Sequence, residues 1–162
     1  YEYMLVVRST PEAMRKLAAK PPYQILQRDE AAHIVWDIKD RRWGCVFFAP
    51  QEVTSHAVAK QTLPIKAVDR PCLVMAEEVR NGQLEMSVAD PDLNIEDHVS
   101  RPKPLRITLR GTWRLLEANG TVCVWPLTDT KKKVRIVSSS AAETVVEIVC
   151  QHGANYDLKL AR

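Results

Sequence analysis

The sequence predicts a mainly β protein, an antiparallel β-sandwich with one short helix near its N-terminus. Short apolar runs alternate with polar residues at a period of two along most of the chain. Asn-Gly occurs twice between such runs, at 81–82 and 119–120, and supplies the positive φ angles that a two-residue hairpin turn requires. Only one segment has helical periodicity, so no set of helices is available to cover a parallel sheet.

The expected helix covers about residues 11–20. Thr10 is a suitable N-cap, and Pro11 fits the first helical position. Met14 and Leu17 lie on one face, and the two prolines at 21 and 22 end the segment.

Strands are expected on both sides of this helix, each as a β-prone run between turn residues. Two hairpins should join PCLVMAEEV to QLEMSVA and TWRLLEA to TVCVWPL, and the most loop-like segment is about 56–70. The other expected strands are 1–7, 23–28, 31–38, 43–49, 104–110, 133–138, 143–150 and 155–160.

Composition limits the classes of protein that fit. A chain of 162 residues with 46% hydrophobic and 27% charged residues can bury one sizeable core, alone or with a small appendage. It has no apolar run of about 18 residues, so no membrane partner is expected. The net charge of +3 permits a polyanionic partner without requiring one, and no nucleic acid is expected. The start, YEYMLVV, has neither an initiator Met nor the features of a signal peptide, which favours a piece of a larger protein.

The basic residues offer one candidate binding surface. In PLRITLR the apolar residues at 105, 107 and 109 point one way, while Arg106 and Arg110 point the other. Lys133 and Arg135 likewise share a strand face, just after the lysines at 131 and 132. If the two strands are neighbours, these four residues form a cationic stripe that could bind an anionic polysaccharide; the alternative is a solvated outer face.

No metal site or cofactor is expected. The cysteines Cys45, Cys72, Cys123 and Cys150 form no CxxC motif or Cys/His cluster, and their apolar neighbours favour buried free thiols over disulfides. In SVADPDLN the acidic residues resemble the first half of an EF-hand loop. However, Ile95 and Arg101 stand where its glycine and its glutamate belong. A turn held by side-chain-to-backbone hydrogen bonds is the favoured interpretation.

Catalytic residues are also not expected. Glu77 and Glu78 are adjacent on a strand and must point to opposite faces. The histidines are isolated, and Ser55-His56 has no accompanying nucleophile elbow, zinc motif or glycine-rich loop. The four histidines are His33, His56, His98 and His152. Three tryptophans lie in apolar strand segments and are expected in the core: Trp36, Trp113 and Trp125. Trp43 stands beside two arginines, and the sequence does not decide whether it is buried or exposed.

The order of several segments resembles the C-terminal end of polysaccharide lyase family 8, most closely the chondroitin sulfate ABC lyases. The segments that carry the resemblance are YEYMLVVRSTPEAMRKLAAKP, YQILQRDEAAHIVWD, WGCVFFAP, RPCLVMAEEV with SVADPDLN, and PLRITLRGTW. After about residue 116 only a compatible β pattern remains.

The resemblance implies a parent enzyme with an N-terminal α/α toroid, a central β domain and a small C-terminal β-sandwich. Such enzymes cleave glycosaminoglycans by β-elimination, with Tyr, Asn, Arg, His and sometimes Glu placed upstream of the stretch that this chain matches. None of those motifs matches a position in this chain; Tyr1, Tyr3, Tyr23 and Tyr156 are outside them. The implied division is a last strand of the central domain at 1–8, a helix and linker at 9–22, and the sandwich at 23–162, with a secreted or periplasmic location.

Three hypotheses follow. The first is the non-catalytic C-terminal part of a chondroitin/dermatan sulfate lyase, inert alone, with the upstream catalytic domains of the same protein as its partner. The second is an independent carbohydrate-binding β-sandwich, and the third is a structural β module of an extracellular protein. The segment 56–70 and the tail depart from the family pattern, so chondroitin ABC, chondroitin AC and hyaluronan specificity all stay open.

Overall fold

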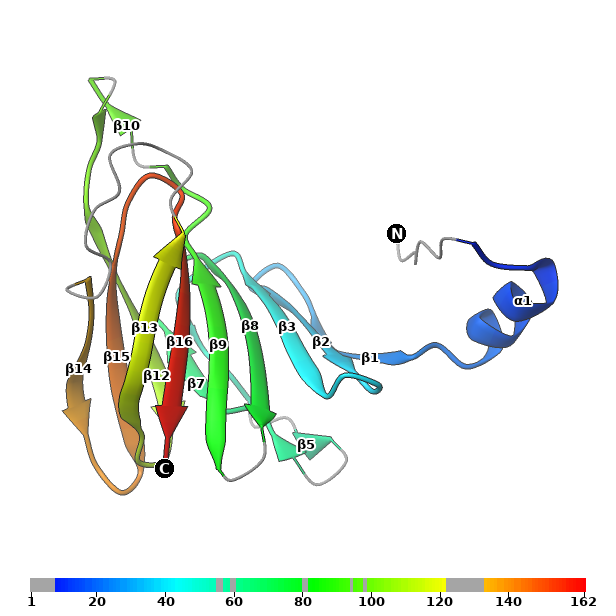
Figure 1. Cartoon of the computed structure of the whole chain (residues 1–162). Helices are drawn as coiled ribbons and strands as arrows, with labels where there is room; N and C mark the ends of the chain where they lie inside the picture. The colour runs from blue at the N-terminus through cyan, green and yellow to red at the C-terminus, as the bar shows by residue number, and fades with distance from the viewer. Residues whose placement is uncertain are drawn as a thin grey trace.

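The chain folds into two antiparallel sheets stacked face to face, which confirms the expected β-sandwich (Figure 1). The computed structural model describes residues 8–54, 57–58, 61–79, 82–93, 95–97, 99–121 and 133–162. The strand expected at 1–7 lies outside the described residues, so its assignment to a preceding domain stays a prediction.

The larger sheet has seven strands, and every neighbouring pair is antiparallel. Its expected hairpin between 72–79 and 83–89 is present, with Val79 opposite Gln83 and Gly82 at φ +69°; Asn81 lies outside the described residues. In spatial order the strands are β1 (Tyr23–Arg28), β2 (Ala32–Asp37), β3 (Arg42–Phe47), β8 (Cys72–Val79), β9 (Gln83–Ala89), β16 (Asn155–Ala161) and β13 (Arg114–Thr121).

The smaller sheet has five strands and packs against the inner face of the first. In spatial order these are β14 (Val134–Ser139), β15 (Glu143–Cys150), β12 (Lys103–Arg110), β7 (Ile65–Val68) and β4 (Gln51–Glu52). Two short ribbons complete the described strands, β10 (Ile95–Glu96) with β11 (Val99–Ser100) and β5 (Ala57–Val58) with β6 (Gln61–Thr62).

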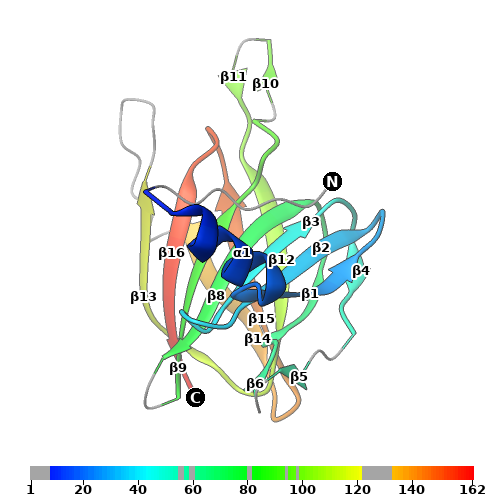
Figure 2. The same cartoon turned by 90° about the vertical axis from the view of Figure 1, so that its right-hand side faces the viewer.

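The helix α1 (Pro11–Ala19) forms where the sequence predicts it. The Thr10 hydroxyl accepts a hydrogen bond from the backbone N–H of Ala13 at 3.2 Å, as an N-cap should. None of its side chains is buried. The helix stands away from the sandwich beyond β1, on the side of the seven-stranded sheet (Figures 1 and 2).

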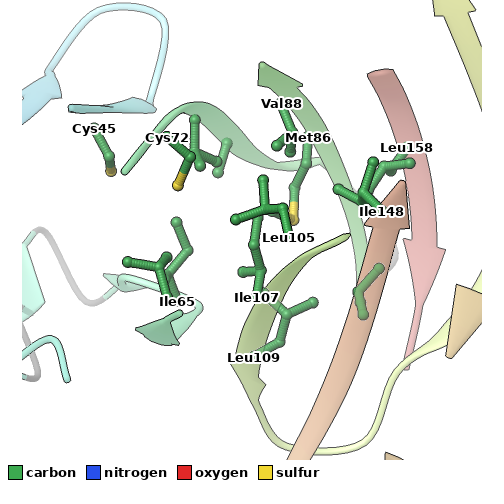
Figure 3. Close-up of a cluster of buried hydrophobic side chains, with 14 of the residues drawn as sticks. Cys45, Ile65, Cys72, Met86, Val88, Leu105, Ile107, Leu109, Ile148 and Leu158 are labelled. Atoms are coloured by element: carbon green, nitrogen blue, oxygen red, sulfur yellow. The ribbon is translucent and has the colours of Figure 1, made fainter. Parts of the chain in front are cut away.

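The core lies between the two sheets and is built by alternate residues of each strand. Leu105 and Ile107 of the smaller sheet face Met86 and Leu158 of the larger one, and all four are almost completely buried (Figure 3). The undecided Trp43 is a core residue, fully buried with its ring centroid 4.6 Å from that of Trp36. Trp113 is also buried, as expected, and Trp125 lies outside the described residues.

The hairpin expected at Asn119-Gly120 is wrong. Strand β13 continues through both residues to Thr121, pairing Asn119 with Asp157 and Gly120 with Tyr156 of β16. The Asn-Gly signal is local, whereas the long ladder with β16 satisfies the backbone groups of the whole segment, so the tertiary pairing prevails.

The loop expected over 56–70 is also wrong for its last part. Residues Ile65–Val68 form β7, which pairs with β12 on one side and β4 on the other, and Ile65 and Val68 are buried. The run is too short, and too close to Pro64, to stand out as a strand from sequence alone.

Candidate interaction surfaces

The predicted basic residues meet on the outer face of the five-stranded sheet, but with an acidic strand between them. β12 and β14 are not neighbours; both pair with β15, and the register places Arg106 and Arg135 on either side of Glu147. Arg106 Nε donates to Glu147 Oε2 at 2.9 Å, and Arg135 Nε and Nη2 donate to Oε1 at 2.8 and 2.6 Å. We call Arg106, Glu147 and Arg135 the arginine row.

The arginine row carries a net charge of about +1 at neutral pH, because one carboxylate serves two guanidinium groups. Hydrogen bonds from Arg106 first and then from Arg135 hold the pKa of Glu147 below its usual range. Glu147 is itself buried, whereas the two arginine side chains are 53% and 71% exposed. The expected uninterrupted cationic stripe is therefore replaced by two exposed guanidinium groups fixed on a buried anion.

The other two candidate residues point to different partners. Arg110 Nη2 donates to the backbone carbonyl of Val53 at 2.6 Å, so this guanidinium is committed within the fold. Lys133 Nζ donates to Gln151 Oε1 at 3.1 Å. Lys66, which sequence reasoning did not select, forms an ion pair with Glu143 on the same face, and this bond raises the pKa of Lys66.

A groove crosses this face beside Arg106. Its volume is about 410 Å³, within the range of small-ligand sites. The lining combines apolar and hydroxyl side chains with one carboxylate; its residues are Ala67, Val68, Asp69, Arg106, Thr108, Val137, Ser138 and Val145.

The outer face of the seven-stranded sheet is divided into two halves. On β2, β3 and β8, and at Phe48 just after β3, the outward residues include an apolar group: Leu73, Met75 and Phe48 are 41%, 52% and 48% exposed, and Val35 and Val46 are half-buried. The Arg42–Glu77 ion pair and His33 share the face with this group. The register sets Val35 and Met75 on either side of Gly44, and Val46 beside Leu73. We call the set Val35, Val46, Phe48, Leu73 and Met75 the apolar half-face.

The other half of the same face is polar. Ser87 Oγ of β9 lies 2.9 Å from Asn155 Oδ1 and 2.7 Å from Asp157 Oδ1 of β16, and its single hydrogen is shared between these two acceptors. Lys159 lies 3.8 Å from Glu85 and 3.6 Å from Glu117, on the strands on either side of it. Charges of alternate sign across the strands keep this half solvated, which is the usual state of an outer sheet face.

The stretch SVADPDLN forms a turn, as the sequence predicts. Asp90 is 5% exposed, accepts a hydrogen bond from the N–H of Asp92 at 2.9 Å, and lies 3.7 Å from the Arg70 guanidinium. Asp92 in turn accepts from Lys103 at 3.0 Å. Among the described residues, which exclude Asn94, no group of three His, Cys, Asp or Glu side chains is placed to hold a metal ion.

The remaining sequence candidates lie apart from one another. Glu77 accepts from Arg42 and Glu78 from Arg162, in keeping with opposite faces of β8. The His33 ring packs edge-on against Phe48, with 5.1 Å between centroids. His152 lies in the turn before β16, and His56 and His98 lie outside the described residues.

Three of the cysteines are free and buried, as expected, and Cys123 lies outside the described residues. Burial raises the pKa of Cys45 and of Cys150 to about 12 and raises that of Cys72 further. Tyr156 is similarly inert: its hydroxyl donates to the Val149 carbonyl at 2.9 Å, and burial raises its pKa to about 12. These groups serve packing and are not placed as bases or nucleophiles.

The fold is therefore that of a β-sandwich domain with a candidate interaction surface on each outer face. Residues 24–96 match the family model "Polysaccharide lyase family 8, C-terminal beta-sandwich domain". The chain carries the C-terminal β-sandwich of polysaccharide lyase family 8, as its sequence resemblance indicates, and no helix in the part that the structure describes could span a membrane.

The relatives are much longer than this chain. It is 26% identical over 188 residues to the chondroitin sulfate ABC exolyase of Bacteroides thetaiotaomicron, covering 100% of this chain and 17% of the relative. It is 30% identical over 128 residues to the chondroitin sulfate ABC endolyase of Proteus vulgaris, covering 75% and 12%. The chain thus spans 12–17% of the length of these two relatives.

Two solved structures share the fold. A xanthan lyase from Paenibacillus superposes with a TM-score of 0.64 at 17% identity, over 94% of this chain and 12% of the other. A mutant of the chondroitin AC lyase of Streptomyces coelicolor A3 gives 0.63 at 12% identity, over 94% and 17%. These two lyases are named for different polysaccharides, so the sandwich fold alone does not identify a substrate.

Proposed function

We propose that this chain is the non-catalytic C-terminal domain of a chondroitin/dermatan sulfate lyase that cleaves by β-elimination, and that it packs against upstream catalytic domains of the same protein. The observation that carries the proposal is that all of this chain aligns with a chondroitin sulfate ABC lyase while spanning only 17% of it. A secreted or periplasmic location belongs to the same proposal, and fractionation of the producing cell would test it.

The arrangement of the titratable groups supports the non-catalytic part. Abstraction of a weakly acidic carbon-bound proton needs a base within hydrogen-bond reach and donors that stabilise the developing negative charge. The Tyr156 hydroxyl is buried and committed to the Val149 carbonyl. His33 packs against Phe48 on the larger sheet, and the arginine row lies on the outer face of the other sheet. No shared centre for these groups exists among the described residues.

The apolar half-face supports the packing part. Leu73, Met75 and Phe48 present a contiguous apolar surface on one half of a sheet whose other half is mostly polar. Contiguous exposed apolar surface of this kind marks an interaction site. The helix α1, with Met14 38% exposed, stands off the sandwich on the same side (Figure 2). An upstream domain seated between the helix and the sheet would cover both.

Activity tests the first part of the proposal. The purified chain is incubated with chondroitin sulfate while the ultraviolet absorbance of unsaturated uronate is followed, with a full-length lyase of the family as the positive control. No product is expected from this chain. Sustained product formation that co-purifies with the chain through two orthogonal columns would refute the non-catalytic assignment.

Binding in trans tests the second part. The chain is mixed with the separately produced upstream region of its parent enzyme, and co-elution is measured by size exclusion. Met75→Lys should abolish co-elution, because it places a charge in the apolar half-face. Leu116→Lys, a 43% exposed apolar residue on the edge strand β13 of the same sheet, is the matched control and should leave it intact. Equal loss in both variants, or in neither, would contradict docking through this half-face.

A further inference from the structure

We propose that the groove on the outer face of the five-stranded sheet binds an anionic polysaccharide, with Arg106 and Arg135 holding a sulfate or carboxylate group of the chain. This proposal rests on the proposed function only for the class of polymer that the site would bind. The site itself follows from the fixed geometry of the arginine row and from the groove beside it.

The arginine row is built in advance of any ligand. Arg106 donates to Glu147 through Nε, and Arg135 through Nε and Nη2, so these hydrogen bonds use only part of the donor capacity of the two guanidinium groups. A guanidinium offers five N–H donors in a rigid plane and binds carboxylate and sulfate-like anions through paired hydrogen bonds. Because Glu147 already restricts both side chains, less conformational entropy is lost when they bind an anion.

The groove next to Arg106 suits the ring of a sugar. Thr108 of β12 lies opposite Val145 of β15, which lies opposite Ser138 of β14, and together they form an uncharged row between the charged ones. Val137 is 47% exposed at one side of the groove. Apolar patches and hydroxyl groups side by side match the C–H faces and hydroxyls of a pyranose.

Beyond this uncharged row lies a cluster of balanced charge. Lys66 pairs with Glu143, which lies opposite Arg110 in the register, and Glu52 is a second carboxylate that acts on Lys66. Arg110 is also committed to the Val53 carbonyl. The positive charge available to an anionic group on this face therefore lies at the arginine row.

One carboxylate opposes binding. Asp69 lines the groove, and its Oδ1 accepts the backbone N–H of Arg106 at 2.8 Å. This hydrogen bond uses one of the acceptor sites of Asp69, but its single negative charge opposes the excess of about one positive charge at the arginine row, so binding relies on the exposed guanidinium groups of Arg106 and Arg135. The expected affinity is accordingly modest and strongly dependent on salt, because the attraction between exposed charges is screened.

The test is binding of chondroitin sulfate to the whole chain, measured by isothermal titration at low and at physiological salt. Wild-type chain should bind, and the affinity should fall as salt rises. The double variant Arg106→Gln, Arg135→Gln should bind at least about tenfold more weakly, since each charge-assisted hydrogen bond contributes about 1.5–3 kcal/mol. The single variant Arg135→Gln, at a 71% exposed side chain, should fold normally and bind severalfold more weakly.

Arg42→Gln is the matched control. Arg42 also pairs with a carboxylate, Glu77, but lies on the outer face of the other sheet. It should keep wild-type affinity within about twofold, because it removes the same charge without touching the groove. Equal weakening by Arg42→Gln and by Arg135→Gln, which remove one charge each, would overturn the site and indicate a general charge effect.

Two further arms identify the polymer. Unsulfated chondroitin distinguishes a carboxylate contact from a sulfate contact, and either result supports the site. Binding of duplex DNA as tight as that of chondroitin sulfate, or no binding of chondroitin sulfate at low salt, would overturn the proposal. The titration does not measure lyase activity. Failure to bind would therefore contradict the groove as a binding site but not the proposed non-catalytic role. Product formation by the chain would contradict the non-catalytic role but not the groove as a binding site.

Discussion

Two leucine-to-alanine substitutions that remove the same atoms should lower the free energy of unfolding by different amounts, one in the core and one on the apolar half-face. Leu105→Ala acts on β12, where Leu105 is fully buried between the sheets (Figure 3). Leu73→Ala acts on the outer face of β8, where Leu73 is 41% exposed. Both changes delete three carbon atoms, so the difference between them reports the environment of the side chain.

The magnitudes follow from burial. Losing three buried carbons costs about 2.4 kcal/mol of transfer free energy, and the cavity left in a closed core raises the cost to about 3–4 kcal/mol. At Leu73 solvent fills the space, so no cavity remains and the expected loss is about 1 kcal/mol. For a domain of this size the unfolding midpoint should fall by about 9 °C for Leu105→Ala and about 3 °C for Leu73→Ala.

Urea denaturation followed by tryptophan fluorescence measures both losses, because Trp36, Trp43 and Trp113 are buried and report on the core. Circular dichroism during heating gives the midpoints. If Leu73→Ala costs as much as Leu105→Ala in the isolated chain, then Leu73 is not solvent-facing, and the assignment of the apolar half-face is refuted.

Two other predictions follow from burial and backbone geometry. Unfolding free energy should fall as pH rises from about 9 to about 12, because the unfolded thiols lose their protons near 9 while the folded ones keep theirs; the slope approaches about 1.4 kcal/mol per pH unit for each thiol. The thiols are those of Cys45, Cys72 and Cys150. Denaturation curves recorded at a series of pH values measure this loss of stability, and reaction with a thiol reagent measures the accessibility of the thiols. Reaction of the folded protein with the reagent at pH 8 would contradict the prediction. Gly153→Ala should destabilise more than Gly111→Ala: both sites have positive φ, but a Cβ at 153 would lie 2.7 Å from Leu93 Cδ2 and one at 111 has open space. Equal midpoints for the two variants would show that Leu93 moves aside without cost.

Local rules recovered most of the elements. The helix begins at Pro11 as predicted, because the residues that cap a helix lie within a few positions of its first turn. The strands with clear alternation form within a residue or two of their expected bounds. Strand β12 shows why: its inward apolar residues and outward polar ones alternate without interruption over the six positions 105–110. Such a segment satisfies only one packing arrangement.

The failures are places where a distant partner decides. Asn119-Gly120 has the chemistry of a turn, but the ladder with β16 draws it into a strand. Residues Ile65–Val68 carry little local signal and become a strand because β12 and β4 lie on either side. Single-sequence patterns hold no information about which strand will be adjacent, so both errors were unavoidable at that level.

The arginine row shows the same limit at the level of a site. The alternation of side chains along a strand is enough to place Arg106 and Arg110 on one face of their strand, and Lys133 and Arg135 on one face of theirs. Whether the two sets meet depends on strand order, and the order inserts β15 with Glu147 between them. The residue that defines the geometry of the row could not be selected from the sequence, because a glutamate in the apolar run ETVVEIVC has no local mark of its partners.

Strand β8 carries the clearest sign in the sequence that a further layer covers the sandwich. An antiparallel strand with one solvated face alternates apolar and polar residues, as β16 does in NYDLKLA. The run CLVMA of β8 is apolar at five successive positions, with Cys72, Val74 and Ala76 turned into the core and Leu73 and Met75 turned outward. Continuous apolar runs are typical of strands buried on both faces. The same five residues therefore encode both the inner packing of this domain and the surface through which we propose that it joins the rest of its enzyme.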